Sequence, residues 1–506
     1  MKRTLSVLLI AFMLVGMVPI LSFPAFAAEA WDGTTATAPQ GNGSQNDPYL
    51  IASAENLAWM AKQIGDGTVT AGTIKNPFNG KYFRQIADID LGGKDFYPIG
   101  YYFKDNENMY VFGGNYDGQG YTIKNGNIKA YSGVEGNKNW GTGLFGVIYG
   151  ATIKNLVFEK MTATVEVPVV GIVVGRSATS DITDTDFNVI AHVMVKSSCV
   201  LNNNWKFTTS GAFTYIGQTG GIIGMAESTA IRYCTNKADI NVVGNIQANG
   251  GIVGTLNGCE VSYCVNTGNL KVDTAANANK SESQFGGIAG IILPITKGDE
   301  TSVSSGNVTI SNCYNTGNFT FSGSSSSAAI AIGGILGGTN SLYKGGTFTI
   351  EKCYNLNAKN TINISYSNVR VGGILGSAYQ PAANASKGTD FAQINIKDSY
   401  SVEITEGKNQ ASHYQATNEY VYRDNKNLAG KPEVNATNVG TKTETEIKTL
   451  TAPIDQAIAN AKVTPGTPGG GTTSPVTGSM MIYVAAVMLV LTAAVLLTKR
   501  NKKIFN

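Results

Sequence analysis

The chain has 506 residues, of which 60 are glycine and only 14% are charged, a composition typical of a turn-rich β protein and not of a helical one. Its formal net charge is +3, but six basic residues lie in the two terminal segments described below, so the part between them carries a small net negative charge. No basic patch interleaved with aromatic residues occurs, so the sequence gives no support for nucleic-acid binding.

Residues 1–27 are predicted to be a secretory signal peptide. Lys2 and Arg3 precede an apolar run from Leu5 to Leu21. Small residues follow it and fit the pockets of the signal peptidase, which places the cut after Ala27. A retained N-terminal anchor is the weaker alternative, because the apolar run is short for a membrane span. The residues assigned to this cleavage site are Ala25, Ala27 and Ala28.

Residues 28–128 are predicted to form an N-terminal cap and the first β-coils. A short helix is expected from about Ser53, since four apolar residues after it recur at helical spacing and would fall on one face. Such a helix can cover the open end of a stack of strands. The four apolar residues are Leu57, Met60, Ala61 and Ile64.

Residues 129–402 contain two repeated phrases. The first is Gly-Gly-Ile-x-Gly, which begins at Gly220, Gly250, Gly286, Gly333 and Gly372. The second contains Cys-x-Asn and follows the first four copies, starting at Cys234, Cys264, Cys313 and Cys353, while Ser399-Tyr400-Ser401 follows the fifth. The spacing between copies varies from 30 to 47 residues, which indicates a constant core with loops of variable length.

This pattern predicts an all-β fold, a right-handed parallel β-helix-like solenoid with short capping helices. Apolar β-branched residues between glycines favour short strands, and equivalent residues of stacked coils form columns about 4.8 Å apart. We expect the isoleucines of the first phrase to form an interior column. The asparagines of the second phrase are expected at a turn in the left-handed conformation, with each amide bonded to the next coil. An array of β-sandwiches is the alternative, but the repeats are too short for it. The two columns are Ile222, Ile252, Ile288, Ile335 and Ile374, and Asn236, Asn266, Asn315 and Asn355.

The six cysteines are interpreted as free thiols. Six cysteines in an exported chain suggest disulfides, but four of them occupy one position of equivalent repeats, as small buried residues do. Cys199 and Cys259 lie outside that phrase, and a bridge between Cys259 and Cys264 is the alternative. No CxxC pair occurs, so no zinc site is expected. No other metal and no cofactor is expected either.

Residues 403–464 are predicted to form a last coil and a second capping helix, from Thr443 to Lys462. A linker rich in proline and glycine follows at 465–473. Residues 474–506 combine a pentapeptide, an apolar stretch from Met480 to Leu497 that is long enough to span a bilayer, and a basic tail that stays in the cytoplasm. A plain single-pass membrane protein is the alternative to the anchor described next.

The order of these C-terminal features resembles a sortase sorting signal. The resemblance implies that a sortase attacks the Thr477–Gly478 carbonyl and transfers the threonine to a peptidoglycan cross-bridge. This pentapeptide begins Ser-Pro where the commonest version begins Leu-Pro, as in the variant usually read by class B-type sortases. The implied recognition residues are Ser474, Pro475, Val476, Thr477 and Gly478.

The repeats resemble the GLUG-motif family of bacterial surface proteins. The likeness covers roughly residues 31 to 400 and includes Trp31-Asp32-Gly33, Asp47-Pro48-Tyr49 and Gly143-Leu144-Phe145-Gly146. It implies the fold and a surface setting, but little about activity, because the family serves mostly as a repeat scaffold.

The sequence carries few signs of catalysis. Its two histidines, His192 and His413, lie outside any His-Glu-x-x-His motif, and there is no nucleophile elbow or phosphate-binding loop. Carboxylates are the best candidates for catalytic groups, because β-helices can host polysaccharide-cleaving aspartates. Most of the aspartates considered in this sequence, however, occur beside turn glycines or in a polar loop. The aspartates considered are Asp88, Asp90, Asp95, Asp117, Asp181, Asp184 and Asp186.

Two functions therefore remain. The first is a wall-anchored, non-catalytic scaffold or adhesin that binds a glycan or a host surface protein. The second is a wall-bound carbohydrate-active enzyme. Five tyrosines could stack on sugars, although packing of loops against coils is the commoner role of such residues. They are Tyr101, Tyr102, Tyr110, Tyr116 and Tyr121.

Overall fold

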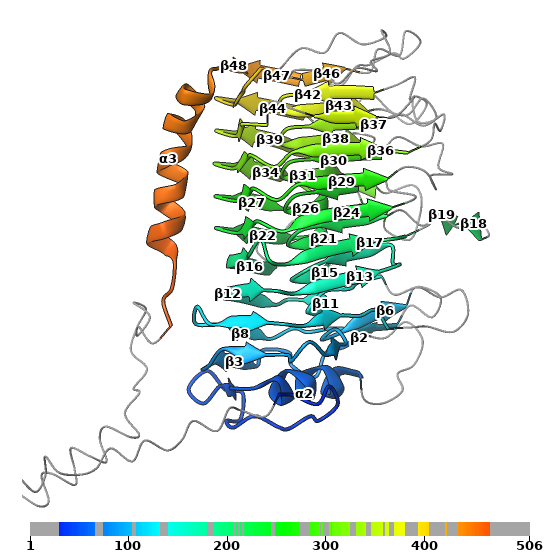
Figure 1. Cartoon of the computed structure of the whole chain (residues 1–506), viewed down its shortest axis with the longest axis vertical. Coiled ribbons are helices and arrows are strands. Elements are labelled where there is room, and N and C mark those ends of the chain that lie inside the picture. The colour runs from blue at the N-terminus through cyan, green and yellow to red at the C-terminus, as the bar shows by residue number, and fades with distance from the viewer. Residues whose placement is uncertain are drawn as a thin grey trace, which may run out of the picture.

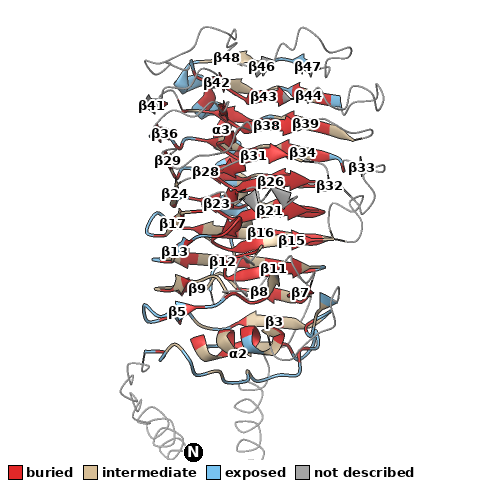
Figure 2. Ribbon diagram, turned by 90° about the vertical axis from the view of Figure 1, so that its right-hand side faces the viewer, coloured by how far each residue is buried: buried red, intermediate tan, exposed pale blue. Residues whose placement is uncertain are grey.

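The computed structural model is a tall stack of parallel strands (Figure 1), and Figure 2 shows that the buried residues are concentrated on these strands. The described residues are 30–65, 74–103, 108–131, 140–179, 187–205, 209–210, 213–214, 217–243, 248–273, 283–293, 295–296, 303–304, 306–323, 330–340, 346–357, 360–363, 369–379, 393–403, 420–422 and 434–465.

Four parallel sheets build the stack, and the coils from β12 to β43 pass through them in the order sheet 1, sheet 2, sheet 4, sheet 3. Sheet 1 has 19 strands, two in most coils: β1 (Tyr49–Ile51), β3 (Tyr82–Gln85), β4 (Ile89–Asp90), β8 (Asn115–Asp117), β9 (Thr122–Lys124), β12 (Thr152–Glu159), β16 (Asn188–Val195), β22 (Thr229–Arg232), β23 (Thr235–Asn236), β27 (Glu260–Ser262), β28 (Val265–Asn266), β34 (Val308–Ser311), β35 (Tyr314–Asn315), β39 (Thr347–Glu351), β40 (Tyr354–Asn355), β44 (Gln393–Lys397), β45 (Tyr400–Ser401), β47 (Val434–Thr437) and β48 (Gly440–Thr441).

The other three long sheets complete each coil. Sheet 2 contains β5 (Asp95–Phe96), β10 (Asn127–Ile128), β13 (Thr162–Val165), β17 (Val200–Asn203), β24 (Asp239–Val243), β29 (Leu270–Asp273), β36 (Phe319–Ser322) and β41 (Thr361–Asn363). Sheet 3 contains β11 (Phe145–Tyr149), β15 (Val174–Ala178), β21 (Ile223–Glu227), β26 (Val253–Asn257), β31 (Ala289–Ile292), β38 (Leu336–Asn340), β43 (Leu375–Tyr379) and β46 (Tyr420–Tyr422). Sheet 4 contains β14 (Val169–Gly171), β20 (Gln218–Gly220), β25 (Ala248–Gly250), β30 (Ser283–Gly286), β37 (Ile330–Gly333) and β42 (Val369–Gly372).

Small sheets and one helix complete the N-terminal part and the edges. The three-stranded sheet is β2 (Ile74–Lys75), β7 (Asn108–Tyr110) and β6 (Tyr101–Phe103), and the two hairpins are β18 (Thr209–Ser210) with β19 (Phe213–Thr214) and β32 (Ile295–Thr296) with β33 (Val303–Ser304). Helix α2 (Ala54–Gly65) lies across the N-terminal end of the stack and buries Leu57, Met60, Ala61 and Ile64 in the main core (Figure 1). The predicted N-terminal helix and its buried apolar face are therefore confirmed.

The predicted isoleucine column is confirmed. All five isoleucines have no exposed surface and belong to the main core. Their backbones are in contact from coil to coil, since the amide of Ile222 donates to the carbonyl of Ile252 at 3.0 Å and that of Ile288 donates to Ile335 at 3.0 Å. In such a stack the isoleucine of each coil is covered by those of the coils above and below it. The core therefore continues from coil to coil along the solenoid.

The cysteines also stack in the interior, where all six are buried and unpaired thiols. The amide of Cys264 lies 3.4 Å from the sulfur of Cys313, and the amide of Cys353 lies 3.1 Å from the hydroxyl of Ser399. Ser399 thus occupies the position that cysteine holds in the earlier coils. The prediction of free thiols is confirmed.

The asparagine column is confirmed, but its predicted backbone conformation is wrong. The side-chain amide nitrogens of Asn236, Asn266 and Asn315 donate to the side-chain oxygen of the next asparagine at 3.0, 2.9 and 3.2 Å. These asparagines lie in short strands. The left-handed residues are the ones just before the cysteines, among them Tyr233 and Tyr263, with φ of 55° and 52°.

The glycines of the first phrase allow the bend between sheets 4 and 3 to reach across the interior to the asparagine ladder. A Cβ at Gly287 would lie 2.4 Å from Cγ of Asn315 and 2.1 Å from the carbonyl oxygen of Gly334. A Cβ at Gly250 would lie 2.1 Å from the carbonyl oxygen of Val253. Side chains cannot occupy these positions without moving backbone, so the two repeated phrases form one structural unit.

The second helix does not cap the C-terminal end, which corrects the prediction. Helix α3 (Glu444–Ala461) begins beside the last coil and runs back along the outer face of sheet 1 (Figure 1). Its ends agree with the predicted ones, and Thr443 and Glu446 form a capping box at its start. Only its position differs, because the apolar face of α3 packs against the outer face of sheet 1 and not against the end of the stack.

Candidate functional site

The processing residues predicted at the two ends, Ala25, Ala27 and Ala28 and Ser474 to Gly478, lie outside the described residues. So does the apolar stretch from Met480 to Leu497. Among the helices that the structure describes, none is long and apolar enough to cross a membrane.

The candidate catalytic aspartates serve turns and ladders. Asp88 and Asp90 are both exposed on either side of the buried Ile89, so the prediction that they share a face is confirmed. The carboxylate of Asp88 accepts the backbone N–H of Thr122 at 2.8 Å. The carboxylate of Asp90 accepts from the backbone N–H of Gly92 at 2.9 Å, as expected for a turn residue.

The remaining aspartates give the same result. Asp117 accepts the side-chain amide of Asn155 at 2.8 Å and lies 3.4 Å from the ammonium of Lys154. Asp95 lies 3.6 Å from the ammonium of Lys129. Asp181, Asp184 and Asp186 lie outside the described residues. Within the described part, no group of three or more acidic, histidine or cysteine side chains could hold a metal ion.

The predicted tyrosine cluster packs loops against coils. Tyr116 is completely buried and its hydroxyl donates to the side-chain oxygen of Gln85 at 3.2 Å. Tyr101 stacks on Tyr110 with ring centroids 4.2 Å apart and also meets Tyr131 at 4.6 Å. Tyr101, Tyr110 and Tyr116 therefore make packing contacts within the protein.

The structure reveals a different feature on the outer face of sheet 1, a column of mainly apolar residues that point away from the core. Each is the middle residue of the Cys-x-Asn phrase or its equivalent in an earlier coil, and the members pair in register from strand to strand. We call it the outer column; it consists of Val157, Met194, Thr235, Val265, Tyr314, Tyr354 and Tyr400.

Helix α3 covers the C-terminal half of the outer column. Ile447 and Ile454 of the helix are buried with Val265 and Tyr354 in a hydrophobic cluster separate from the main core. The hydroxyl of Tyr314 donates to the carboxylate of Asp455 at 2.6 Å. The helix thus explains why apolar and aromatic residues occupy outward positions on this sheet.

A second column runs beside the outer column, at the left-handed bends. His192, Tyr233 and Tyr263 stack with centroids 4.8 and 5.0 Å apart and ring planes within 11° of parallel. Burial is the main cause that lowers the pKa of His192, the nearby Lys154 lowers it further, and Asp117 opposes them. The imidazole is therefore uncharged at neutral pH and can stack on tyrosine without desolvating a cation.

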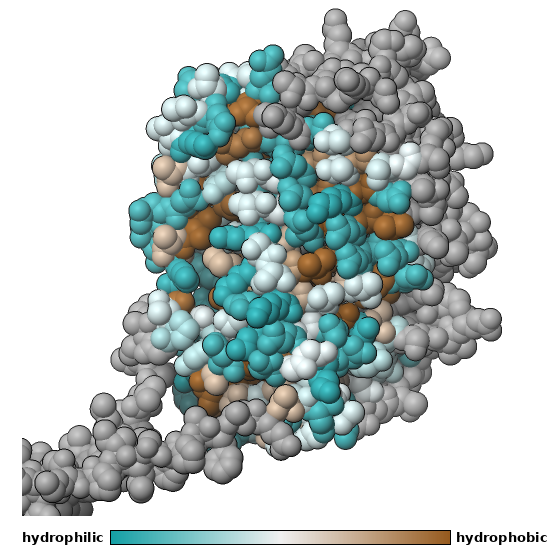
Figure 3. Space-filling view, in the orientation of Figure 1, coloured by the Kyte–Doolittle hydropathy of each residue, from teal (hydrophilic) through white to brown (hydrophobic). Residues whose placement is uncertain are grey.

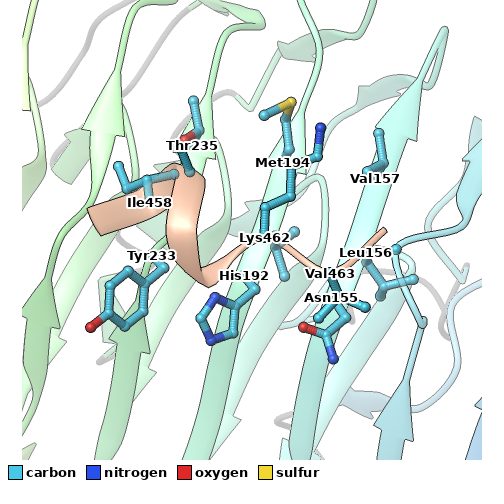
Figure 4. Close-up of a pocket in the computed structure, with 13 residues that line it drawn as sticks. Asn155, Leu156, Val157, His192, Met194, Tyr233, Thr235, Ile458, Lys462 and Val463 are labelled. Carbon is cyan, nitrogen blue, oxygen red and sulfur yellow. The ribbon is translucent and has the colours of Figure 1, made fainter. Parts of the chain in front are cut away.

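A pocket of about 230 Å³ lies where the last turn of α3 leaves the outer column (Figure 4). His192 and Tyr233 stand side by side on the sheet, and Met194 and Val157 lie above them in this view. Ile458 and the chain through Lys462 and Val463 close the opposite side. The remaining residues that line it are Gly120, Asn155, Leu156, Val193, Thr235 and Ala459.

The lining of this pocket suits binding more than catalysis. His192 contributes an imidazole, Tyr233 a phenol and Lys462 an ammonium group, and the residues that line the pocket include no carboxylate. The first three coils of the outer column give the pocket its apolar base. Sequence analysis noted His192 but did not predict the pocket, although the apolar middle residues of the second phrase were a visible signal that this face is covered.

The fold and this site define the protein as a parallel β-solenoid with a helix packed along one side. The sequence matches no family model, and no curated protein matches it significantly. One similar solved structure is the 1.30 Å crystal structure of a Bacteroides ovatus chain described as a "putative immunoglobulin A1 protease". It is 18% identical, the match covers 82% of this chain and 89% of that one, and the TM-score is 0.41.

Proposed function

We propose that the protein is an exported GLUG-type surface protein, attached by a sortase to the wall of a Gram-positive cell and acting as a non-catalytic scaffold or adhesin. In this proposal residues 1–27 direct export and the apolar stretch from Met480 holds the precursor in the membrane. A sortase then joins Thr477 to a peptidoglycan cross-bridge. The right-handed β-helix between these ends contacts a glycan or a host surface protein.

The observation that carries the proposal is the path of the chain after the last coil. Helix α3 runs back along sheet 1, and the residues after it reach the turn between β8 and β9. A Cβ at Gly120 in that turn would lie 2.4 Å from the carbonyl oxygen of Val463. The chain therefore leaves the solenoid close to its N-terminal end.

This exit point suits a wall anchor. A tether that follows Pro465 would hold the N-terminal end near the wall and direct the later coils outward. The visible face of the described residues is mostly hydrophilic with scattered hydrophobic residues, as expected for a surface exposed to solvent (Figure 3). The structural hydrogen bonds of Asp88, Asp90 and Asp117 favour a scaffold over a polysaccharide-cleaving enzyme.

The test of anchoring is the replacement Thr477→Ala, with Thr473→Ala as its control. Thr477→Ala removes the acyl donor, so the protein should still be exported but should remain in the membrane fraction. Thr473→Ala changes a threonine of the adjoining linker and should leave attachment to the wall intact. Fractionation of cells before and after wall digestion distinguishes the two.

Two results would contradict the anchoring proposal. Wall linkage of the Thr477→Ala protein with loss of its basic tail would exclude Thr477 as the acyl donor. A wild-type protein that partitions with membranes and retains Lys499 to Lys503 would be a single-pass membrane protein. The adhesin part is tested separately by applying the wall-released protein to a glycan array and to host extracellular proteins. Release of shortened sugars in that assay would instead indicate an enzyme.

A further inference from the structure

The outer column extends beyond the helix that covers it. Val265, Tyr354 and the later members pack against α3, whereas Val157 and Met194 continue the column toward the N-terminal end. Both are only partly buried. The pocket lies at this point, between the uncovered members and the last turn of α3.

The size and lining of the pocket suit a small aromatic molecule. An apolar cavity of roughly 150 Å³ can hold benzene, so about 230 Å³ accommodates a one- or two-ring molecule. The side chain of Met194 can adapt to a flat ligand, and thioethers make favourable contacts with ring edges. His192 and Tyr233 add two stacked aromatic rings to the lining.

We propose that this pocket binds a small uncharged molecule carrying an aromatic ring, such as a phenol or an indole, and that the bound ring pins α3 to the coils. One side of the pocket belongs to α3 and the chain after it, through Ile458 and Val463, and the other belongs to the coils through Val157 and Met194. A ligand that contacts both sides binds only when the helix is docked. By linkage, it must then stabilise the docked helix. This proposal does not depend on how the protein is anchored.

The first experiment is a titration of the purified full-length protein with indole, followed by NMR chemical shifts. We expect saturable binding with a dissociation constant of roughly 1 mM, as for a small fragment in a partly open pocket. Met194→Trp should fill the pocket and abolish binding. Thr349→Trp places the same side chain at a half-buried position of β39 on the same sheet, away from the pocket, and should bind indole as the wild type does.

Circular dichroism first establishes that each variant is folded, and Val157→Phe replaces Met194→Trp as the filling variant if the tryptophan disrupts the coil. Absence of saturation in the wild type up to 10-fold above the expected constant would overturn the proposal, a threshold set by the same affinity relation. Equal binding by a folded filling variant would overturn it too, because the ring would then bind elsewhere.

The second experiment measures hydrogen exchange of the α3 amides. Saturating indole should slow exchange in the last two turns of α3, including Ile454 and Ile458, in the wild type and in Thr349→Trp. The filling variant should show no response to indole. Binding of indole without slower exchange in α3 would contradict the pinning role while leaving the pocket as a ligand site.

Discussion

The buried asparagine ladder makes the strongest energetic prediction, which concerns Asn315→Ala. In the structure the side chain of Asn315 accepts from Asn266 at 2.9 Å and donates to Asn355 at 3.2 Å. It also exchanges two hydrogen bonds with the backbone of Gly317, each 3.1 Å long. The alanine variant loses all four bonds in a site that water does not reach.

The expected loss of stability follows from these four bonds. At roughly 0.5–1.5 kcal/mol each, their removal lowers the free energy of unfolding by about 2–6 kcal/mol. The matched control is Asn435→Ala, because Asn435 donates a 3.2 Å bond to Asn395 on the same sheet but is exposed to solvent. Water replaces that bond, so the control should cost less than about 1 kcal/mol.

Urea denaturation followed by circular dichroism measures both variants. The variants should differ in their denaturation midpoints with similar slopes. A change below about 1 kcal/mol in the free energy of unfolding of Asn315→Ala would refute the reasoning, and so would equal changes for the two variants. Loss of buried hydrogen bonds must destabilise the protein more than loss of one exposed hydrogen bond.

Four further predictions concern the interior of the solenoid. Ile335→Asp buries an unpaired charge in the isoleucine column and should lower the melting temperature strongly, whereas a wild-type melting curve would place Ile335 at the surface. Gly287→Ala should lower the free energy of unfolding more than Gly80→Ala, because a Cβ at Gly287 would lie 2.1 Å from a backbone oxygen. A Cβ at Gly80 has open space, so that variant has only the strain of its positive φ, about 1 kcal/mol. Comparable urea midpoints for the two variants would contradict the close packing at Gly287. Denatured, unreduced protein should react with six equivalents of a thiol reagent, and two or fewer would reveal disulfides. In the native protein burial raises the pKa of Cys199 to about 11, so its reaction at pH 8 should be slow and should accelerate as the pH approaches that value; fast reaction at pH 8 would show that this thiol is accessible and ionised.

The periodic part of the fold could be predicted from the sequence because each column repeats one residue type. Isoleucine, cysteine and asparagine recur at fixed positions, and each proved to occupy an interior column. The backbone at the bends could not be predicted in the same way. Tyrosine rarely adopts a left-handed conformation, so nothing in the sequence distinguished Tyr233 and Tyr263 from ordinary strand residues.

The site depends on contacts that join distant parts of the chain. The amphipathic pattern predicted α3 within one residue at each end, but an apolar helix face does not specify which surface covers it. The outward residues Val265, Tyr354 and Tyr400 carried that information, because apolar residues on the outer face of a solenoid require a cover. The pocket itself follows from where the helix stops relative to the coils, which no local pattern encodes.

The length of helix α3 is matched to the number of coils that it passes along the solenoid. Each coil adds about 4.8 Å along the stack, and each helical residue adds about 1.5 Å, so one coil corresponds to roughly three residues of helix. The 18 residues of α3 therefore span about 27 Å, or five to six coil spacings, which is enough to pass the four spacings that separate Tyr400 from Thr235 in the outer column. A chain that gained a repeat without lengthening the helix would move its exit point one coil away from the N-terminal end. Growth of this architecture thus couples two segments of different secondary structure, and a change in coil number has to be matched in the helix by nearly one turn.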